Sequence, residues 1–355
     1  MNDELSPEDE LRLNVLFNTE LKAVRIDESN MTLWALTPQG EASVPLKPNE
    51  RSDRYLKRVR ELLSGHALGS PGGYPVHLTR WTRQSQAGLS AQHLAQLLLI
   101  AEEEAVVAVV HSPALTDELA RYAWWCMPTI ENARLMLMRD VVCQGSMGRT
   151  LAEFLVDHLA FLHEDDVGIL DTVAVMLYSG VLTDAERLSI WKRGTSRNSY
   201  YVAFLELQPD NLPSPRAARA DHADVPPLAG NPYSMMLVKA LSGQGQTFIA
   251  TTATILERPE NQEVVNHTLN ALANWCAPLR QTEDAARNAA RQALLAAAPQ
   301  FASDCDALDA LAAVDADTVR PIFLKTTAIG SLMRRKIQPI VTPLLDAIAI
   351  LRRQP

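Results

Sequence analysis

Two related stretches decide the fold of this chain: LTDELARYAWW at Leu115–Trp125 and LTDAERLSIWK at Leu182–Lys192. Each places a threonine and an acid before a run with helical spacing of its apolar residues. A threonine side chain accepts a backbone N–H of the first helical turn, and an acid favours the positive end of a helix. A polar break and a second apolar stretch follow each copy. Both stretches therefore predict a helical hairpin.

A fainter copy of the pattern starts at Leu89, and helical spacing continues from Ser90 to about Leu207. The intervals between the copies are unequal, so the repeat is irregular. Hairpins with one apolar face bury that face by stacking on their neighbours. The expected fold class is mainly α, with stacked helical hairpins in a HEAT-like irregular α-solenoid and a small N-terminal antiparallel β segment.

The β segment is expected in residues 20–46, where short alternating apolar stretches are separated by two breaks rich in turn residues. This pattern predicts a three-stranded antiparallel meander. A helix is expected over Arg51–Ser64, ended by Gly65, because its apolar side chains recur on one face. Val76–Trp81 is predicted to be a last strand before the helical region.

Residues 208–232 contain six prolines and few large apolar side chains, which is typical of a linker or a surface excursion. The stretch Gln246–Leu256, rich in Thr and Ile, fits a helix or a strand, and we favour a helix. The other helices expected beyond the linker cover Met235–Leu241, Gln262–Trp275, Thr282–Ala298, Ala307–Ala313 and Thr318–Leu351. The last of these is expected to be broken at Pro339 and Pro343. The predicted domains are 1–87, 88–207, 208–232 as the proline-rich linker or excursion, and 233–355.

Composition limits the partners and the location of this protein. The formal net charge of −9 disfavours attraction of the whole molecule to nucleic acid or to an anionic membrane, so such a partner needs a local basic site. Residues 1–10 carry five acids and no apolar run, unlike a secretory signal, so we expect a cytoplasmic location. Charged and polar residues interrupt the two most apolar windows, 94–110 and 235–256, so no membrane insertion is expected.

Several motifs between Pro75 and Leu162 resemble one family. They are VHLTRWTR at 76–83, EEAVVAVVH at 103–111, AWWCMP at 123–128 and GRTLAEFLVDHL at 148–159. These motifs resemble those of the DsrS proteins, which are encoded among the dissimilatory sulfite reductase genes of sulfur-oxidising bacteria. Residues 191–205 resemble the same family more weakly, and the ends of the chain only loosely.

The resemblance implies a cytoplasmic accessory factor for oxidising stored sulfur through the reverse-operating sulfite reductase pathway, and it implies no catalytic residues. We therefore expect a non-catalytic, regulatory protein without a cofactor, whose partners are proteins of the sulfur-oxidation pathway rather than nucleic acid. Two alternatives stay open. One is a cysteine-dependent sulfur carrier, and the other is an RNA-binding post-transcriptional regulator that uses the basic residues of 51–60 and 192–197.

Two thiols are candidates for the sulfur-carrier alternative. A reactive cysteine needs a nearby cation or helix N-terminus and access to its partner. Cys126 follows two tryptophans at a predicted helix end, where a buried, inert thiol is the commoner outcome. Cys143 lies beside two glycines in a predicted turn and is the better candidate for exposure. No Cys-x-x-Cys pair occurs, so neither a zinc site nor a thioredoxin-type motif is expected.

Two basic patches lie beside an aromatic ring. Arg80 and Arg83 flank Trp81, and Lys192, Arg193 and Arg197 follow Trp191. Guanidinium groups at such places can hold an anion or a partner carboxylate, or stack on a base. The commoner arrangement puts the aromatic ring in the core and leaves the cations solvated. Of the two, the loop with Arg193 and Arg197 is our first choice for binding a charged partner.

Other patterns have simpler explanations. His158, His163, Glu164, Asp165 and Asp166 form the densest set of potential metal ligands, but the two histidines are not spaced for one helix face. We expect the acids to cap the next helix, and we expect no metal. The glycines of 69–73 and of 144–148 are predicted to form turns. The cluster Arg334–Lys336 is expected to neutralise a helix C-terminus.

Overall fold

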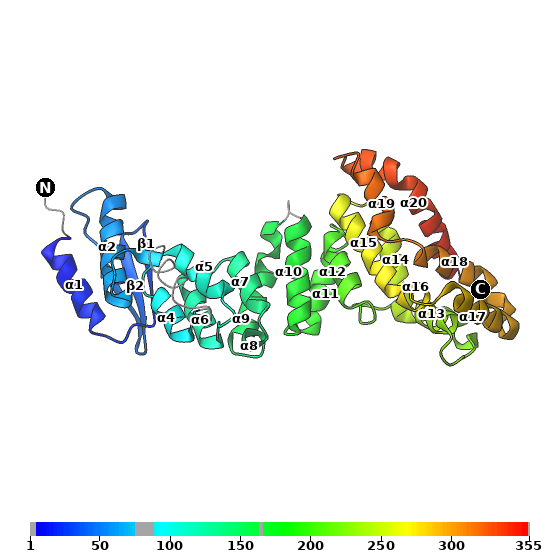
Figure 1. Cartoon of the computed structure of the whole chain (residues 1–355), viewed down its shortest axis with the longest axis horizontal. Helices are drawn as coiled ribbons and strands as arrows, with labels where there is room; N and C mark the ends of the chain where they lie inside the picture. The colour runs from blue at the N-terminus through cyan, green and yellow to red at the C-terminus, as the bar shows by residue number, and fades with distance from the viewer. Residues whose placement is uncertain (1–4, 75–88, 163–165, 354–355) are drawn as a thin grey trace. The chain divides into compact units, whose positions relative to one another are not determined.

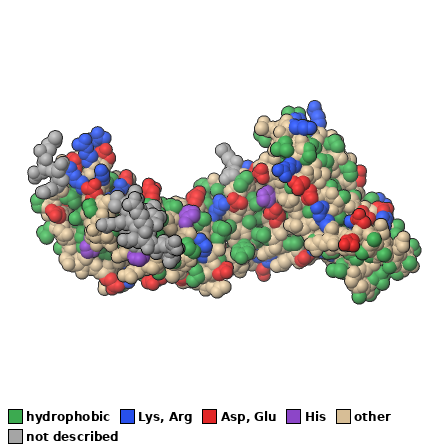
Figure 2. Space-filling view, viewed as in Figure 1, with side chains coloured by type: hydrophobic (Ala, Val, Ile, Leu, Met, Phe, Trp, Pro, Cys, Tyr) green, Lys and Arg blue, Asp and Glu red, His purple; other side chains and the backbone are tan. Residues whose placement is uncertain are grey.

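A computed structural model of the chain describes residues 5–74, 89–162 and 166–353 (Figure 1). Over these residues the protein is mainly helical, with one small antiparallel sheet near the N-terminus, as the sequence predicts. The chain divides into two compact units, Met1–His158 and Leu159–Pro355. Their boundary lies inside the segment 88–207 that the sequence groups as one set of hairpins. Side chains of both charges occur over the visible face of each unit (Figure 2).

The sheet of the first unit is the predicted meander. Its strands are β1 (Ala23–Asp27), β2 (Thr32–Thr37) and β3 (Gly40–Pro45). The central strand β2 pairs antiparallel with both neighbours, in registers that place Ala23 opposite Leu36 and Thr32 opposite Pro45. The tight turn at the start of β3 places Gly40 at a backbone φ of +124°, a conformation that residues with a Cβ atom rarely adopt.

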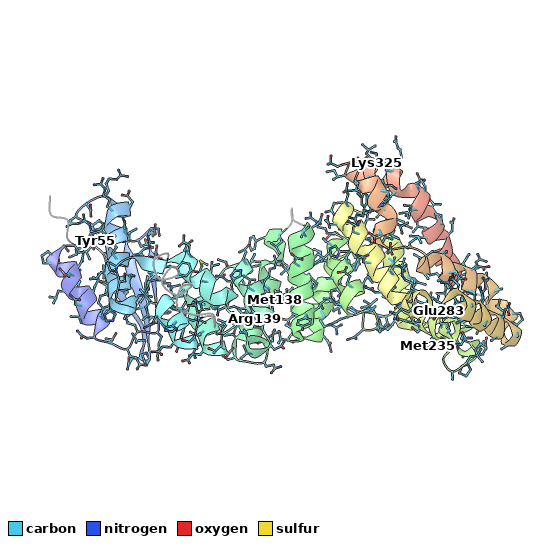
Figure 3. All side chains as sticks on the ribbon, in the orientation of Figure 1. Tyr55, Met138, Arg139, Met235, Glu283 and Lys325 are labelled. Atoms are coloured by element: carbon cyan, nitrogen blue, oxygen red, sulfur yellow. The ribbon has the colours of Figure 1, made fainter. Side chains whose placement is uncertain are left out.

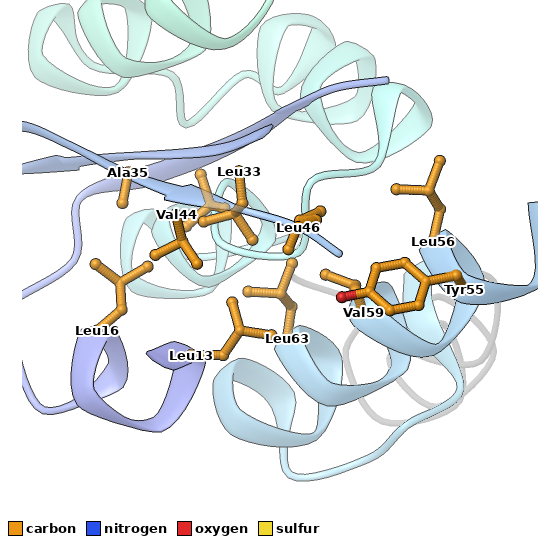
Figure 4. Packing of buried hydrophobic residues seen from close by; sticks show 11 residues of the cluster. Leu13, Leu16, Leu33, Ala35, Val44, Leu46, Tyr55, Leu56, Val59 and Leu63 are labelled. Atoms are coloured by element: carbon orange, nitrogen blue, oxygen red, sulfur yellow. The ribbon is translucent and has the colours of Figure 1, made fainter. Parts of the chain in front are cut away.

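Two helices, α1 (Pro7–Phe17) and α2 (Ser52–Leu68), pack on this sheet and enclose the first core (Figure 4). Tyr55 of α2, labelled in Figure 3, is fully buried in it. The buried residues of this core are Leu13, Leu16, Val24, Leu33, Ala35, Val44, Leu46, Tyr55, Leu56, Val59 and Leu63. Helix α1 is not among the helices expected from the sequence. Its signal is the Ser6 side chain, which accepts the N–H of Asp9 at 3.2 Å and so caps the helix.

Helix α2 runs further than predicted. The expected end at Gly65 is wrong, since the helix continues to Leu68 and ends where Gly69 adopts a φ of +66°. The added turn buries Ala67, so the apolar face continues past Gly65 and the left-handed cap falls on the next glycine. The strand predicted at Val76–Trp81 lies outside the described residues.

The remaining helices of the first unit are α4 (Ala91–Leu97), α5 (Glu103–His111), α6 (Asp117–Cys126), α7 (Ile130–Leu137), α8 (Asp140–Cys143) and α9 (Met147–His158). Among these helices, α6 begins at its predicted threonine cap. The Thr116 hydroxyl accepts the N–H of Leu119 at 3.2 Å, which confirms the N-cap of the first hairpin. Asp117 accepts the N–H groups of Ser146 and Met147, at 2.9 and 3.0 Å, and so caps α9. Helices α6 and α7 pack on each other.

The second unit is built from helices. They are the short 3-10 helix η1 (Leu159–Leu162), α10 (Asp166–Ser179), α11 (Asp184–Arg193), α12 (Ser199–Leu207), η2 (His222–Asp224), α13 (Pro232–Leu241), α14 (Gly243–Glu257), α15 (Gln262–Trp275), α16 (Ala277–Arg280), α17 (Asp284–Ala297), η3 (Pro299–Phe301), α18 (Ala302–Ala312), α19 (Ala316–Phe323) and α20 (Gly330–Leu351). Thr183 and Glu186 form a capping box at the start of α11, which confirms the second predicted hairpin start. Helix α14 confirms the helical interpretation of Gln246–Leu256.

The predicted breaks at Pro339 and Pro343 are wrong. Both prolines lie inside α20, and the break in the segment Thr318–Leu351 falls at residues 324–329 instead. A proline leaves the carbonyl four residues earlier without its helical partner. Both prolines are exposed, so these carbonyls face the solvent side of the helix, where water can bond to them.

The proline-rich segment 208–232 is irregular apart from η2, and it is tied into the second unit. Arg219 of this segment is buried and donates to Asp304 of α18 at 2.6 Å. Its other guanidinium nitrogens donate to Asp221 at 2.7 and 2.8 Å. This buried charge network fixes the segment against the helices.

Candidate functional site

The connection between α11 and α12 forms a rigid basic corner, here defined as residues 192–198. Helix α11 ends at Arg193, where its last carbonyls lack helical partners. The hydroxyls of Thr195 and Ser196 donate to the carbonyls of Lys192 and Arg193, both at 2.8 Å. The cations at this C-terminus are also favoured by the negative end of the helix dipole.

The aromatic ring beside this corner belongs to the core. Trp191 is buried, and its ring meets Tyr201 and Phe204 edge to face, with centroids 4.5 and 5.3 Å apart. Gly194 lies against the Tyr201 ring so closely that a Cβ atom there would lie 2.4 Å from it. Trp191 is therefore a packing residue and offers no open face on which a base or guanidinium could stack.

Arg197 is directed inward and not toward a partner. Its Nε donates to Oδ1 of Asp166 at 2.5 Å, and the Asp166 side chain is only 9% exposed. The same carboxylate accepts from the Ser199 hydroxyl at 3.0 Å and from the Asn261 amide at 2.8 Å. Asp166 thus joins the first turns of α10 and α12 to the N-cap of α15, and Arg197 positions the corner within this network.

A second set of bonds holds the same corner. The backbone N–H of Asn198 donates to Glu260 at 2.9 Å, and its side-chain amide donates to the carbonyl of Arg258 at 3.0 Å. Because Asn198 is buried, these bonds fix the corner without help from solvent. A loop held by both the Asp166 bonds and the Asn198 bonds has little conformational entropy to lose when it binds a partner.

Lys192 and Arg193 are the charges that this arrangement leaves for a partner. Lys192 is exposed and Arg193 is half-buried. Within the described ranges, the ion pairs of this region involve Arg197 and not Lys192 or Arg193. Among the basic candidates that the structure describes, Lys192 is exposed and Arg193 half-buried, whereas Arg197 is engaged by Asp166.

The other predicted patch and part of the predicted ligand cluster lie outside the described residues. Arg80 and Arg83 fall in the undescribed range 75–88, and His163, Glu164 and Asp165 fall in 163–165. His158 stacks on Phe154, and Asp166 is held by Arg197 as described. Among the residues that the structure describes, no group of three His, Cys, Asp or Glu side chains is placed to hold a metal ion.

The thiol of Cys126 lies in the packing between α6 and the sheet. Its sulfur donates to the carbonyl of Val24 at 3.6 Å. Burial raises the pKa of this thiol to about 12, although the charge of Arg25 lowers it in part. A nucleophilic cysteine needs the opposite shift.

Cys143, expected to be the more exposed thiol, is half-buried at the end of α8. Its sulfur donates to the carbonyl of Leu137 at 2.7 Å. Burial first, and then the charge of Asp140, raise the pKa of the thiol. Burial also raises the pKa of Cys276 and of Cys305 to about 12. The shifts at all four thiols disfavour the thiolate.

The structure adds one surface that sequence reasoning missed. The expectation that Arg334–Lys336 neutralise a helix C-terminus is wrong, because these cations lie near the N-terminal end of α20. The helix dipole favours positive charge only at the other end of the helix. The signal was visible in the sequence, since Thr318–Leu345 contains five basic residues and no acid.

No family model matches this chain, and neither the curated proteins nor the solved structures yielded a match. In the described part of the chain, helices lack the length and apolar character needed to cross a membrane.

Proposed function

We propose that this protein is a non-catalytic accessory or regulatory factor that acts through protein contacts, and that the basic corner 192–198 is one of its contact surfaces. The observation that carries the proposal is that Lys192 is exposed and Arg193 half-buried at a corner whose far end is fixed by the bonds of Arg197 and Asn198. Exposed positive charges beside a fixed loop suit recognition of an acidic surface, because charge complementarity steers and orients the encounter.

The pathway that we propose rests on the resemblance of the sequence motifs. The resemblance to the DsrS proteins supports a role in cytoplasmic oxidation of stored sulfur, with proteins of the sulfite reductase pathway as partners. The raised thiol pKa values favour this contact role over a cysteine-dependent sulfur carrier, since a carrier needs an accessible thiolate.

The helix pairs are proposed to form an irregular, HEAT-like solenoid. Two observations support this. The pairs α6–α7 and α11–α12 each begin at a threonine cap, and the two helices of each pair pack on each other. Helix pairs that stack within a unit would give that unit an extended surface for protein contacts.

Charge reversal at the basic corner tests the proposed function. The double variant K192E/R193E is compared with R54E/K57E, which makes the same charge change at exposed positions of α2. Both tagged variants and the wild type are used for affinity capture from sulfur-grown cells, read by quantitative mass spectrometry. Wild type and the α2 control are expected to recover sulfite reductase or sulfur-transfer proteins, and K192E/R193E to recover about tenfold less. Equal recovery by both variants, or no pathway protein with the wild type, would contradict the proposal.

A further inference from the structure

The turn between α19 and α20 exposes large aliphatic side chains. We define the α19–α20 corner as residues 324–336. Leu324 is 79% exposed, Ile329 is 69% exposed and Leu332 is 51% exposed. Exposed aliphatic groups of this size cost free energy in water, and several of them within one turn and the start of one helix mark an interaction surface.

The same corner carries positive charge without compensation along the chain. Lys325, Arg334, Arg335 and Lys336 lie within it, and residues 318–345 contain no acid although the whole protein has a net charge of −9. Across the described part of the chain, the salt bridges do not include any of these four side chains. Figure 2 shows Lys and Arg side chains gathered over this region, and Figure 3 places Lys325 at the outer end of the α19–α20 pair.

The position of these cations gives the helix no dipole stabilisation. Arg334, Arg335 and Lys336 lie in the second turn of α20, far from the helix C-terminus, where positive charge is favoured. Binding to another molecule explains the placement of these cations better than a role in stabilising the fold does.

A groove beside the corner has the chemistry to hold an anionic headgroup. It has a volume of about 410 Å³ and lies between the end of α14 and the first half of α20. Ser331, Arg334, Arg335 and Gln338 line it and offer hydroxyl, guanidinium and amide donors. Glu257 lines the groove as well, so the anion must sit on the arginine side. Guanidinium groups bind phosphate oxygens in a bidentate manner.

We propose that the α19–α20 corner docks on an anionic lipid surface. The three aliphatic side chains enter the headgroup region, while Lys325 and the three cations of α20 meet lipid phosphates. Exposed aliphatic groups surrounded by cations suit a bilayer surface, which needs no matching shape. A protein partner would instead need an apolar surface shaped to fit the three aliphatic side chains. This contact is peripheral, and it uses other residues than the basic corner 192–198.

Vesicle co-sedimentation of the full chain tests the proposal. One set of vesicles contains equal parts phosphatidylglycerol and phosphatidylcholine, and the other contains phosphatidylcholine alone. The wild type is expected to sediment with the anionic vesicles only, and to be released as the salt concentration rises. Each basic residue near an anionic leaflet strengthens binding several-fold, so R334Q/R335Q/K336Q is expected to bind about 100-fold more weakly. L324S/I329S is expected to lose binding as well.

Matched controls separate the corner from general effects. R51Q/R54Q/K57Q removes three exposed cations from α2, and M235S/V238S removes two exposed apolar side chains from α13. Both controls are expected to bind anionic vesicles as the wild type does. The comparison of the two vesicle types uses the wild type alone, so it tests the proposal even if a variant folds poorly. The proposal would be overturned if the wild type failed to bind anionic vesicles or bound neutral vesicles equally well. It would also be overturned if the control variants lost as much vesicle binding as the corner variants, or if the wild type bound polyglutamate and not vesicles.

Discussion

Replacing Asp166 with alanine is the most informative perturbation of the basic corner 192–198. The Asp166 carboxylate, 9% exposed, accepts from Arg197, Ser199 and Asn261 at 2.5 to 3.0 Å. The variant D166A removes all three acceptor contacts at once and leaves the Arg197 guanidinium without its anion. The corner would then lose one of the two sets of bonds that fix it.

The cost follows from the burial of the two partners. Removing one member of a buried ion pair destabilises a protein by about 3–5 kcal/mol. The Arg197 side chain is 21% exposed, so water can solvate part of the released charge. We therefore place D166A at the lower end, about 3 kcal/mol. D166N keeps an acceptor oxygen for some of the neighbours and is expected to cost about 1–2 kcal/mol.

Two measurements detect this change. Urea unfolding followed by circular dichroism gives the free energy of unfolding, and hydrogen exchange read by mass spectrometry reports on the peptide that covers 194–200. D184A is the matched control, because the Asp184 side chain is fully exposed and pairs with Arg187 at 3.7 Å. D184A is expected to change the free energy of unfolding by less than about 0.5 kcal/mol.

A double-mutant cycle with R197M isolates the ion pair. The coupling between D166A and R197M is expected to be about 1–2 kcal/mol, because the two side chains touch. The reasoning is refuted if D166A stays within about 0.5 kcal/mol of the wild type, or if exchange at 194–200 is unchanged.

Three further predictions follow from other contacts. The hydrogen bond to Glu206, at 2.7 Å, raises the pKa of His267, so this pair stabilises the fold below a pH of about 6.5 and loses its effect as pH rises through the raised pKa. The loss of unfolding free energy in H267Q should therefore be larger at acidic than at alkaline pH, and an equal loss at both would contradict it. R219M leaves Asp304 buried and unpaired and should cost about 3–5 kcal/mol in urea unfolding, whereas R219M/D304L should cost clearly less; equal costs would argue against the pair. Cys276 and Cys305 are buried and should react with iodoacetamide only after denaturation, and Cys143 should react slowly in the native protein. Cys126 is half-buried, but it should also resist native alkylation because burial raises its thiol pKa to about 12; fast native alkylation at Cys126 would revive the sulfur-carrier alternative.

Local sequence signals predicted much of the fold. Alternating apolar residues and turn residues define the meander, and threonine caps define the starts of α6 and α11, because these effects act between residues close in the sequence. Ser6 is an N-cap of the same kind, but helix α1, which follows it, was not predicted. Prolines misled the prediction at α20, since a proline on the exposed face of a helix is tolerated where water can bond to the freed carbonyl.

The candidate site was less predictable, because it depends on contacts between distant residues. Sequence placed Lys192, Arg193 and Arg197 in one patch. Only the fold shows that Arg197 turns inward to Asp166 while Lys192 stays exposed and Arg193 half-buried. The environment of Cys143 likewise depends on the carbonyl of Leu137 and on burial, which the neighbouring glycines do not reveal.

Site-specific photo-crosslinking tests most directly whether the basic corner binds a protein of the sulfur-oxidation pathway. A photoreactive phenylalanine derivative replaces Lys192 in the full chain, and the control carries it at the exposed Lys57 of α2. After irradiation of sulfur-grown cells, the adducts are purified and identified by mass spectrometry. We expect an adduct with sulfite reductase or a sulfur-transfer protein from position 192 and none from position 57. Absence of such an adduct at 192, or the same adduct from both positions, would contradict it.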